Sequence, residues 1–130
     1  MILSALLALA VATQDPEIDC DDAMAQFELN ACAYKDFERA DAAMNAQWKI
    51  TAARMKTIDA EFDRTQDNRP GYFDTLLAAQ RAWLAYRDKQ CASEGYTMRG
   101  GSAEPMVISG CQTQLTDART KQLKDLIEEY

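Results

Sequence analysis

Residues 76–91 read LLAAQRAWLAYRDKQC, and this stretch decides the fold. It contains no Pro, Gly or β-branched residue, and its Ala, Leu, Gln, Arg and Lys content favours an α-helix. One stripe of such a helix carries Leu76, Gln80, Trp83, Leu84, Arg87 and Cys91. Apolar side chains on a stripe need only volume, whereas a semi-buried Gln or Arg needs partners that are fixed in place. We therefore expect other helices to pack against this one and to supply those partners.

The segment before this stretch also reads as a helix. Apolar residues recur at steps of three, four and seven over residues 21–63, which predicts one long helix, either continuous or broken near Leu29 or Asn30. Its apolar stripe consists of Tyr34, Phe37, Met44, Trp48, Met55, Ile58 and Phe62. The Asn, Pro and Gly of residues 64–71 then predict a loop.

The central helix is expected from residue 73 to 90 or 91. Four glycines and a proline predict a long loop over residues 92–110, and a third helix is expected over residues 109–128. One side of that helix carries Leu115, Arg119, Leu123 and Leu126. The predicted fold class is therefore all-α, a small helical hairpin or three-helix bundle.

The amino-acid composition limits the classes of function that the protein can have. At 130 residues, 48% of them hydrophobic and 27% charged, the chain is long enough for one globular domain with a modest core. The formal net charge of −7 argues against a nucleic-acid partner, because phosphate binding needs clustered Lys and Arg, and favours basic proteins instead. The chain has no histidine, which excludes catalysis by Ser/His or Cys/His pairs within it. We predict no metal site and no cofactor.

Residues 1–12, MILSALLALAVA, are apolar and uncharged. They are too few to span a bilayer as a helix, and they end in a small-x-small pattern that suits signal peptidase. We expect a signal peptide at 1–12 and a mature domain at 13–130, periplasmic or secreted, with no stable membrane insertion after cleavage. The alternative is that residues 1–12 stay in the mature chain as an apolar strand or helix. No Cys lies at the cleavage point itself, so a lipid anchor is not indicated.

The four cysteines predict two disulfide bonds in an oxidising compartment. A four-thiolate zinc site is less favoured, because the spacing lacks any C-x-x-C pair. The preferred pairing joins Cys20 to Cys32 and Cys91 to Cys111, which would pin the glycine-rich loop. Pairing of Cys32 with Cys91 is the close alternative, since spacing alone does not fix the connectivity.

Several motifs together resemble one known family. They are Cys20, Cys32-Ala33, Asp41, Asn45, Trp48, the run Gln80-Arg81-x-Trp83-x-x-Tyr86-Arg87-Asp88-x-x-Cys91, Cys111, and Leu115-Thr116-x-x-Arg119-Thr120. Over about residues 19–128 this pattern resembles the lysozyme inhibitor LprI-like N-terminal domain family, with Trp48 in place of a more usual Tyr. The resemblance implies a small secreted helical domain of the bacterial envelope that is not an enzyme, in a family of which one founding member is described as inhibiting lysozyme.

A polar stripe is the main candidate site. Asp41, Asn45 and Trp48 lie at i, i+4 and i+7, matching the spacing of Gln80, Trp83 and Arg87, so the two sets can face each other across an antiparallel hairpin. We expect Asp41 to pair with Arg87 or Arg119. The favoured interpretation is a buried network that fixes helix register, and the alternative is a groove that presents Arg and Trp to a ligand such as a glycan.

Three functions are compatible with the sequence. The resemblance favours a secreted binding protein that inhibits lysozyme, either through an acidic face that meets a basic enzyme or through insertion of the 92–110 loop into its cleft. Candidate acidic residues are Asp36, Glu38, Asp59, Glu61 and Asp63. The alternative is a structural or adaptor module of the cell envelope with no effect on lysozyme. A hydrolase with paired carboxylates is least favoured, because no pair carries a recognisable pocket signature.

Overall fold

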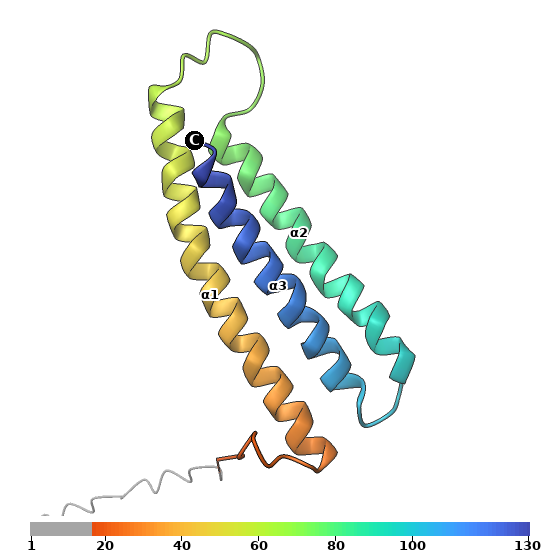
Figure 1. The fold of residues 1–130 in the computed structure, drawn as a ribbon. Helices are drawn as coiled ribbons and strands as arrows, with labels where there is room; N and C mark the ends of the chain where they lie inside the picture. The colour runs from red at the N-terminus through yellow and green to blue at the C-terminus, as the bar shows by residue number, and fades with distance from the viewer. Residues whose placement is uncertain (1–16) are drawn as a thin grey trace, which may run out of the picture.

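The computed structural model describes residues 17–130, and the predicted signal peptide lies outside them. Within that range the chain forms three long helices, α1 (Gln26–Glu61), α2 (Tyr72–Gly95) and α3 (Glu104–Glu128), with the short 3-10 helix η1 (Tyr96–Met98) after α2. Consecutive long helices run antiparallel, so α1 and α3 point the same way (Figure 1). The predicted all-α bundle is confirmed. No helix in the described part of the chain is long and apolar enough to cross a membrane.

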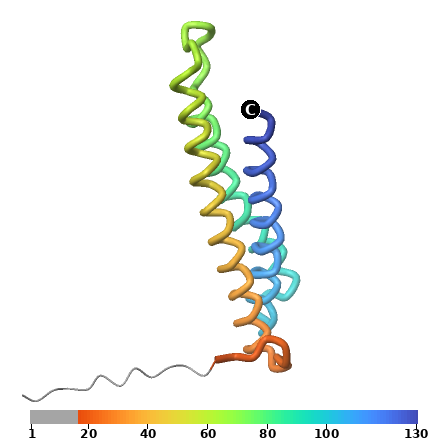
Figure 2. The backbone as a smooth tube through the Cα atoms, turned by 60° about the vertical axis from the view of Figure 1, so that its left-hand side comes forward, coloured from red at the N-terminus to blue at the C-terminus, as the bar shows by residue number. Residues whose placement is uncertain are grey.

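The bundle is asymmetric. α3 packs most extensively against α1, less against α2, and the direct contact between α1 and α2 is the smallest of the three. α1 and α2 converge near the loop that joins them and diverge towards the other end, with α3 lying beside both (Figures 1 and 2). The backbones of α1 and α2 are therefore further apart in the half of the molecule that holds the start of α1 and the end of α2.

The hydrophobic core is small. Met44, Met55, Leu76 and Leu123 form a buried cluster, and Trp48, Phe73, Trp83 and Leu126 pack around it. The predicted apolar stripe of α1 is thus buried in its middle, whereas Tyr34 and Phe62 near its ends are exposed. A core this small contributes limited stability, so disulfide bonds are expected to help stabilise the fold.

α1 starts later than predicted, at Gln26, and it is not broken near Asn30. The Glu28 carboxylate accepts hydrogen bonds from the amides of Met24 and Ala25, both at 3.1 Å, which satisfies donors just ahead of the helix. The Cys20–Cys32 disulfide holds residue 20 beside the second turn of α1, so the helix cannot extend back to residue 21. The Asn30 side chain donates to the Ser102 carbonyl, 2.9 Å away, so it does not compete for the helix backbone.

The prediction of a long loop over residues 92–110 is wrong. α2 continues to Gly95, and α3 begins at Glu104, so only residues 99–103 are non-helical between η1 and α3. Pro105 lies in the first turn of α3, where its missing amide donor costs nothing. The turn itself depends on Gly100, whose φ of 75° favours glycine, and its amide donates to the Glu104 carboxylate at 2.7 Å.

Candidate functional site

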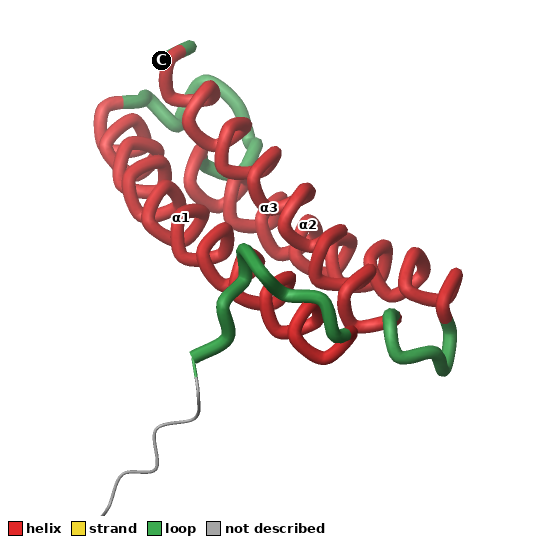
Figure 3. The backbone as a smooth tube through the Cα atoms, turned by 60° about the horizontal axis from the view of Figure 1, so that its bottom comes forward, coloured by secondary structure: helices red, strands yellow, loops and turns green. Residues whose placement is uncertain are grey.

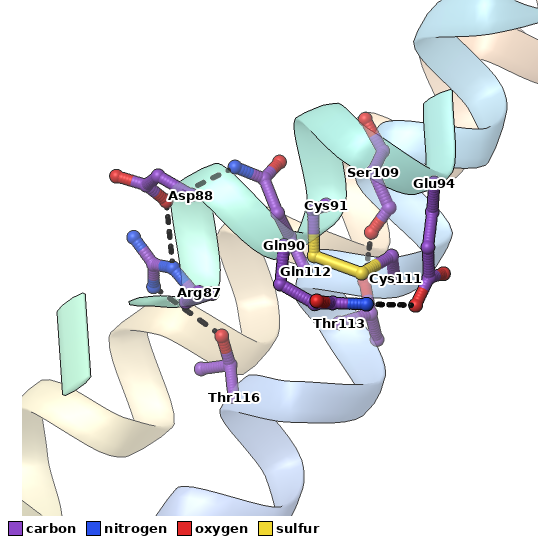
Figure 4. The surroundings of a disulfide bond; sticks show 10 residues. All are labelled: Arg87, Asp88, Gln90, Cys91, Glu94, Ser109, Cys111, Gln112, Thr113 and Thr116. Carbon is purple, nitrogen blue, oxygen red and sulfur yellow. Dashed lines mark hydrogen bonds and ion pairs between the residues drawn. A yellow bond between two sulfur atoms is a disulfide. The ribbon is translucent and has the colours of Figure 1, made fainter. Parts of the chain in front are cut away.

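Arg87 of α2 is the centre of the polar stripe, and its side chain joins the three long helices. Its Nη1 atom donates to Asp41 Oδ1 of α1 at 3.0 Å and to Thr116 Oγ1 of α3 at 3.3 Å. Its Nε atom donates to the neighbouring Asp88 at 3.0 Å (Figure 4). Arg87 is only 7% exposed, and Thr116 is fully buried. The predicted partnership of Asp41 is therefore made with Arg87 and not with Arg119.

Aromatic rings cover the Arg87 guanidinium. Its central carbon lies 5.0 Å from the centre of the Phe37 ring and 5.3 Å from the centre of the Trp83 ring. Both distances are within the range of a cation–π interaction, which strengthens when the cation is shielded from water. The rings occupy space that a ligand would need in order to reach this guanidinium.

Arg119 occupies a second part of the stripe, and its central carbon lies 5.8 Å from the centre of the Trp83 ring that Arg87 also contacts. Its Nε atom donates to Gln80 Oε1 at 2.9 Å, and its Nη1 atom donates to Gln122 Oε1 at 3.2 Å. Gln80 in turn points its amide at the sulfur of Met44, 3.6 Å away. Burial lowers the pKa of the Arg119 guanidinium, although an arginine remains protonated at neutral pH. The Nη2 atom of Arg119 is buried and finds no acceptor within residues 17–130.

The remaining stripe residues lie at the edge of these contacts. Asn45 is exposed and donates to Asp41 Oδ2 at 3.3 Å. Trp48 is half-buried and packs against the core, with its ring centre 6.4 Å from that of Phe73. The structure thus brings Asp41, Asn45 and Arg87 into one network but leaves Trp48 outside it. Thr116, which the sequence did not single out as a partner, completes the network.

The two disulfide bonds have the preferred connectivity, Cys20 with Cys32 and Cys91 with Cys111. The second bond joins α2 to α3 one turn beyond Arg87. Close to it, the Gln112 side chain of α3 donates a hydrogen bond to the Asp88 carboxylate of α2 (Figure 4). The first bond holds the segment that precedes α1 against that helix. Both bonds therefore lie in the half of the bundle that holds the start of α1 and the end of α2.

The five acidic candidates do not form one surface. Asp59 accepts the amides of Tyr72 and Phe73, at 2.7 and 3.0 Å, and so caps the start of α2. These backbone hydrogen bonds lower the pKa of Asp59, the one from Phe73 most. The pKa of Asp63 is also lowered, chiefly by the hydroxyl of Thr65. Both carboxylates therefore have local structural partners.

The other acidic candidates, Asp36, Glu38 and Glu61, are exposed on α1. Asp36 also lines a shallow groove of about 740 Å³ where the segment before α1 lies against that helix. The groove is lined by Glu17, Ile18, Asp19, Cys20, Asp21, Cys32, Lys35, Asp36 and Arg39. Four carboxylates thus face two basic side chains, and Figure 3 shows the segment crossing beside the start of α1. We call this feature the acidic groove.

This geometry defines a class of protein. It is a small α-helical domain with two disulfides, a buried arginine network and an acidic groove. The family model described as lysozyme inhibitor LprI matches residues 20–123, and the chain therefore belongs to that family. An uncharacterized protein of Rhizobium meliloti (strain 1021) is 44% identical over 115 residues, covering 88% of this chain and 83% of the relative. No solved structure matches.

Proposed function

We propose that the protein is a periplasmic or secreted inhibitor of lysozyme that acts by binding the enzyme and performs no catalysis itself. The observation that carries this proposal is the match of the lysozyme inhibitor LprI model across all three long helices. Two disulfides support an oxidising compartment, because such bonds persist outside the reducing cytosol. Cleavage of a signal peptide after Ala12 is part of the same proposal.

The binding surface that we propose is the acidic groove. A partner with a basic surface is attracted by the net charge of −7, and the groove holds four carboxylates against two basic side chains, a surplus of two negative charges. The Cys20–Cys32 bond fixes the segment that supplies three of them, so little ordering cost is incurred when a partner binds. The short turn at residues 99–103 is a weaker candidate for insertion into an enzyme cleft, because it is much shorter than the loop expected there.

The test measures residual lysozyme activity on cell-wall substrate while the oxidised protein is titrated in, at low and moderate salt. We expect stoichiometric inhibition that weakens as salt rises, because salt screens exposed charges. Neutralising Glu17, Asp21 and Asp36 together, as Glu17→Gln, Asp21→Asn and Asp36→Asn, removes three exposed charges. If each contributes about 0.5 kcal/mol, the inhibition constant rises about tenfold.

The matched control neutralises Asp117, Glu128 and Glu129, which are exposed on α3 or just after it. Both triple variants have the same net charge, so a difference between them reports the position of the charges. Equal losses of inhibition would leave the acidic groove without a special role. Absence of inhibition by the unaltered, helical and disulfide-bonded protein would instead favour the envelope adaptor.

A further inference from the structure

A second concave surface lies at the other end of the bundle, near the loop between α1 and α2. This cleft has a volume of about 840 Å³ and is built from the end of α1, the start of α2 and the last turns of α3. Tyr72 and Leu76 of α2 line it opposite Leu126 of α3, and Tyr130 lies in edge-to-face contact with Tyr72, with ring centres 5.7 Å apart. Its walls are therefore largely apolar and aromatic, as small-molecule sites usually are.

The carboxylates that line this cleft are already engaged. Asp59 caps the start of α2, and Asp67 forms an ion pair with Arg69 at 2.6 Å. At the chain end, the Tyr130 backbone oxygen accepts a hydrogen bond of 2.8 Å from Arg54. Two further cations line the cleft, Arg64 and Arg119, and neither makes an ion pair within residues 17–130. Together with the backbone amides of α2, the charge of Arg64 lowers the pKa of Asp59, so Arg119 is the cation that the cleft offers to an anion.

Arg119 lines the cleft and is half-buried, so part of its side chain is within reach of a ligand. Its guanidinium is oriented by Gln80 and Gln122, and its Nη2 atom is enclosed without an acceptor among residues 17–130. A carboxylate that meets the accessible part of this guanidinium would form charge-assisted hydrogen bonds, which are stronger than those between neutral groups. Arg119 lies seven residues before Leu126 on α3, or about 10 Å along the helix, so a ligand that touches both residues has to span about that distance.

We infer that this cleft binds a small monocarboxylic acid with an unbranched apolar body, whose carboxylate pairs with Arg119 and whose body packs between Tyr72 and Leu126. The distance of about 10 Å between Arg119 and Leu126 suits an unbranched chain better than a compact ring system. The positive charge of Arg119 selects a carboxylate over an alcohol or an amine of the same length. This activity is separate from the inhibition of lysozyme proposed above, because the acidic groove lies at the opposite end of α1.

The experiment titrates octanoate into the purified disulfide-bonded protein by isothermal calorimetry, with octan-1-ol, octylamine and acetate as comparison ligands. We expect one octanoate to bind per chain. Octan-1-ol, octylamine and acetate should each bind at least about tenfold more weakly, because the alcohol lacks the charge, the amine carries the wrong one and acetate lacks the apolar body. Equal affinity for octanoate and octan-1-ol, or no heat of binding from octanoate, would overturn the inference.

Two neighbouring alanines of α2 provide a matched pair of variants. Ala79 and Ala78 are both exposed, but only Ala79 lines the cleft, so a large side chain at either position leaves the fold intact. Ala79→Trp should fill the cleft and weaken octanoate binding by about tenfold or more, whereas Ala78→Trp should change it by less than about twofold. Equal effects of the two substitutions would show that octanoate binds elsewhere and would refute the assignment.

Discussion

Replacement of Arg87 by alanine tests whether the polar network holds the bundle together. The substitution removes the bonds to Asp41 and Thr116 and leaves the space of a side chain that is 7% exposed. Removing one partner of a buried ion pair costs about 3–5 kcal/mol. Because the Asp41 side chain is 36% exposed, water replaces part of its lost interaction, and we expect a loss of about 2–4 kcal/mol.

The assay is thermal unfolding of the oxidised protein, followed by circular dichroism. For a domain of this size a loss of 1 kcal/mol lowers Tm by about 4 °C, so Arg87→Ala should lower it by about 8–15 °C. Arg81→Ala on the same helix is the control, because Arg81 is exposed and its loss should cost less than about 0.5 kcal/mol. Arg87→Met keeps most of the apolar stem and should fall between the two.

The interpretation as a structural network fails if Arg87→Ala unfolds within about 2 °C of the unaltered protein. In that case the buried charge contributes as much desolvation cost as attraction, which is a known outcome for buried ion pairs. The alternative of a ligand groove would then gain support, because the network around Arg87 would need a role other than stability. If the same variant still inhibited lysozyme, the ligand of that groove would have to be a molecule other than lysozyme.

Three further predictions concern a cap, a disulfide and two glycines. Asp59→Asn should lower Tm at neutral pH, and the difference from the unaltered protein should shrink below about pH 4, because a carboxylate with a lowered pKa stabilises the fold above its ordinary pKa and loses that effect as it is protonated. Replacing Cys91 and Cys111 by serine opens a loop of 20 residues and should cost about 3 kcal/mol in chemical denaturation. Gly95→Ala should destabilise by about 1–3 kcal/mol, since the added Cβ would lie 2.5 Å from the side chain opposite, whereas Gly110→Ala meets nothing within 4 Å and should stabilise by about 0.5–1 kcal/mol.

Periodicity predicted the helices well where packing and propensity agree. The composition of the run around Arg87 predicts a helix. Its polar side chains on the buried stripe require partners from the other helices, so the pairing of Arg87 with Asp41 could be predicted. The region after Cys91 misled because glycine and proline usually end helices. Gly95 instead lies where α2 approaches α3 closely, which the sequence of α2 alone does not reveal. Pro105 lies in the first turn of α3, where a proline is compatible with a helix.

The candidate surfaces were less predictable. Asp59 and Asp63 looked equivalent to Asp36, because a sequence shows charge but not which amide a carboxylate will meet. The cleft near Tyr72 was not foreseen, since its lining comes from three segments that are far apart in the chain. Tertiary proximity of that kind leaves no periodic signal in any one segment.

The 36 residues of α1 make it about 54 Å long, and this length acts as a spacer. Asp36 in the acidic groove and Asp59 at the cleft are about 35 Å apart along it. On the two proposals above, an enzyme at the acidic groove and a small acid in the cleft occupy opposite ends of α1 and do not compete for the same surface. Saturation with such an acid should therefore leave the inhibition curve unchanged.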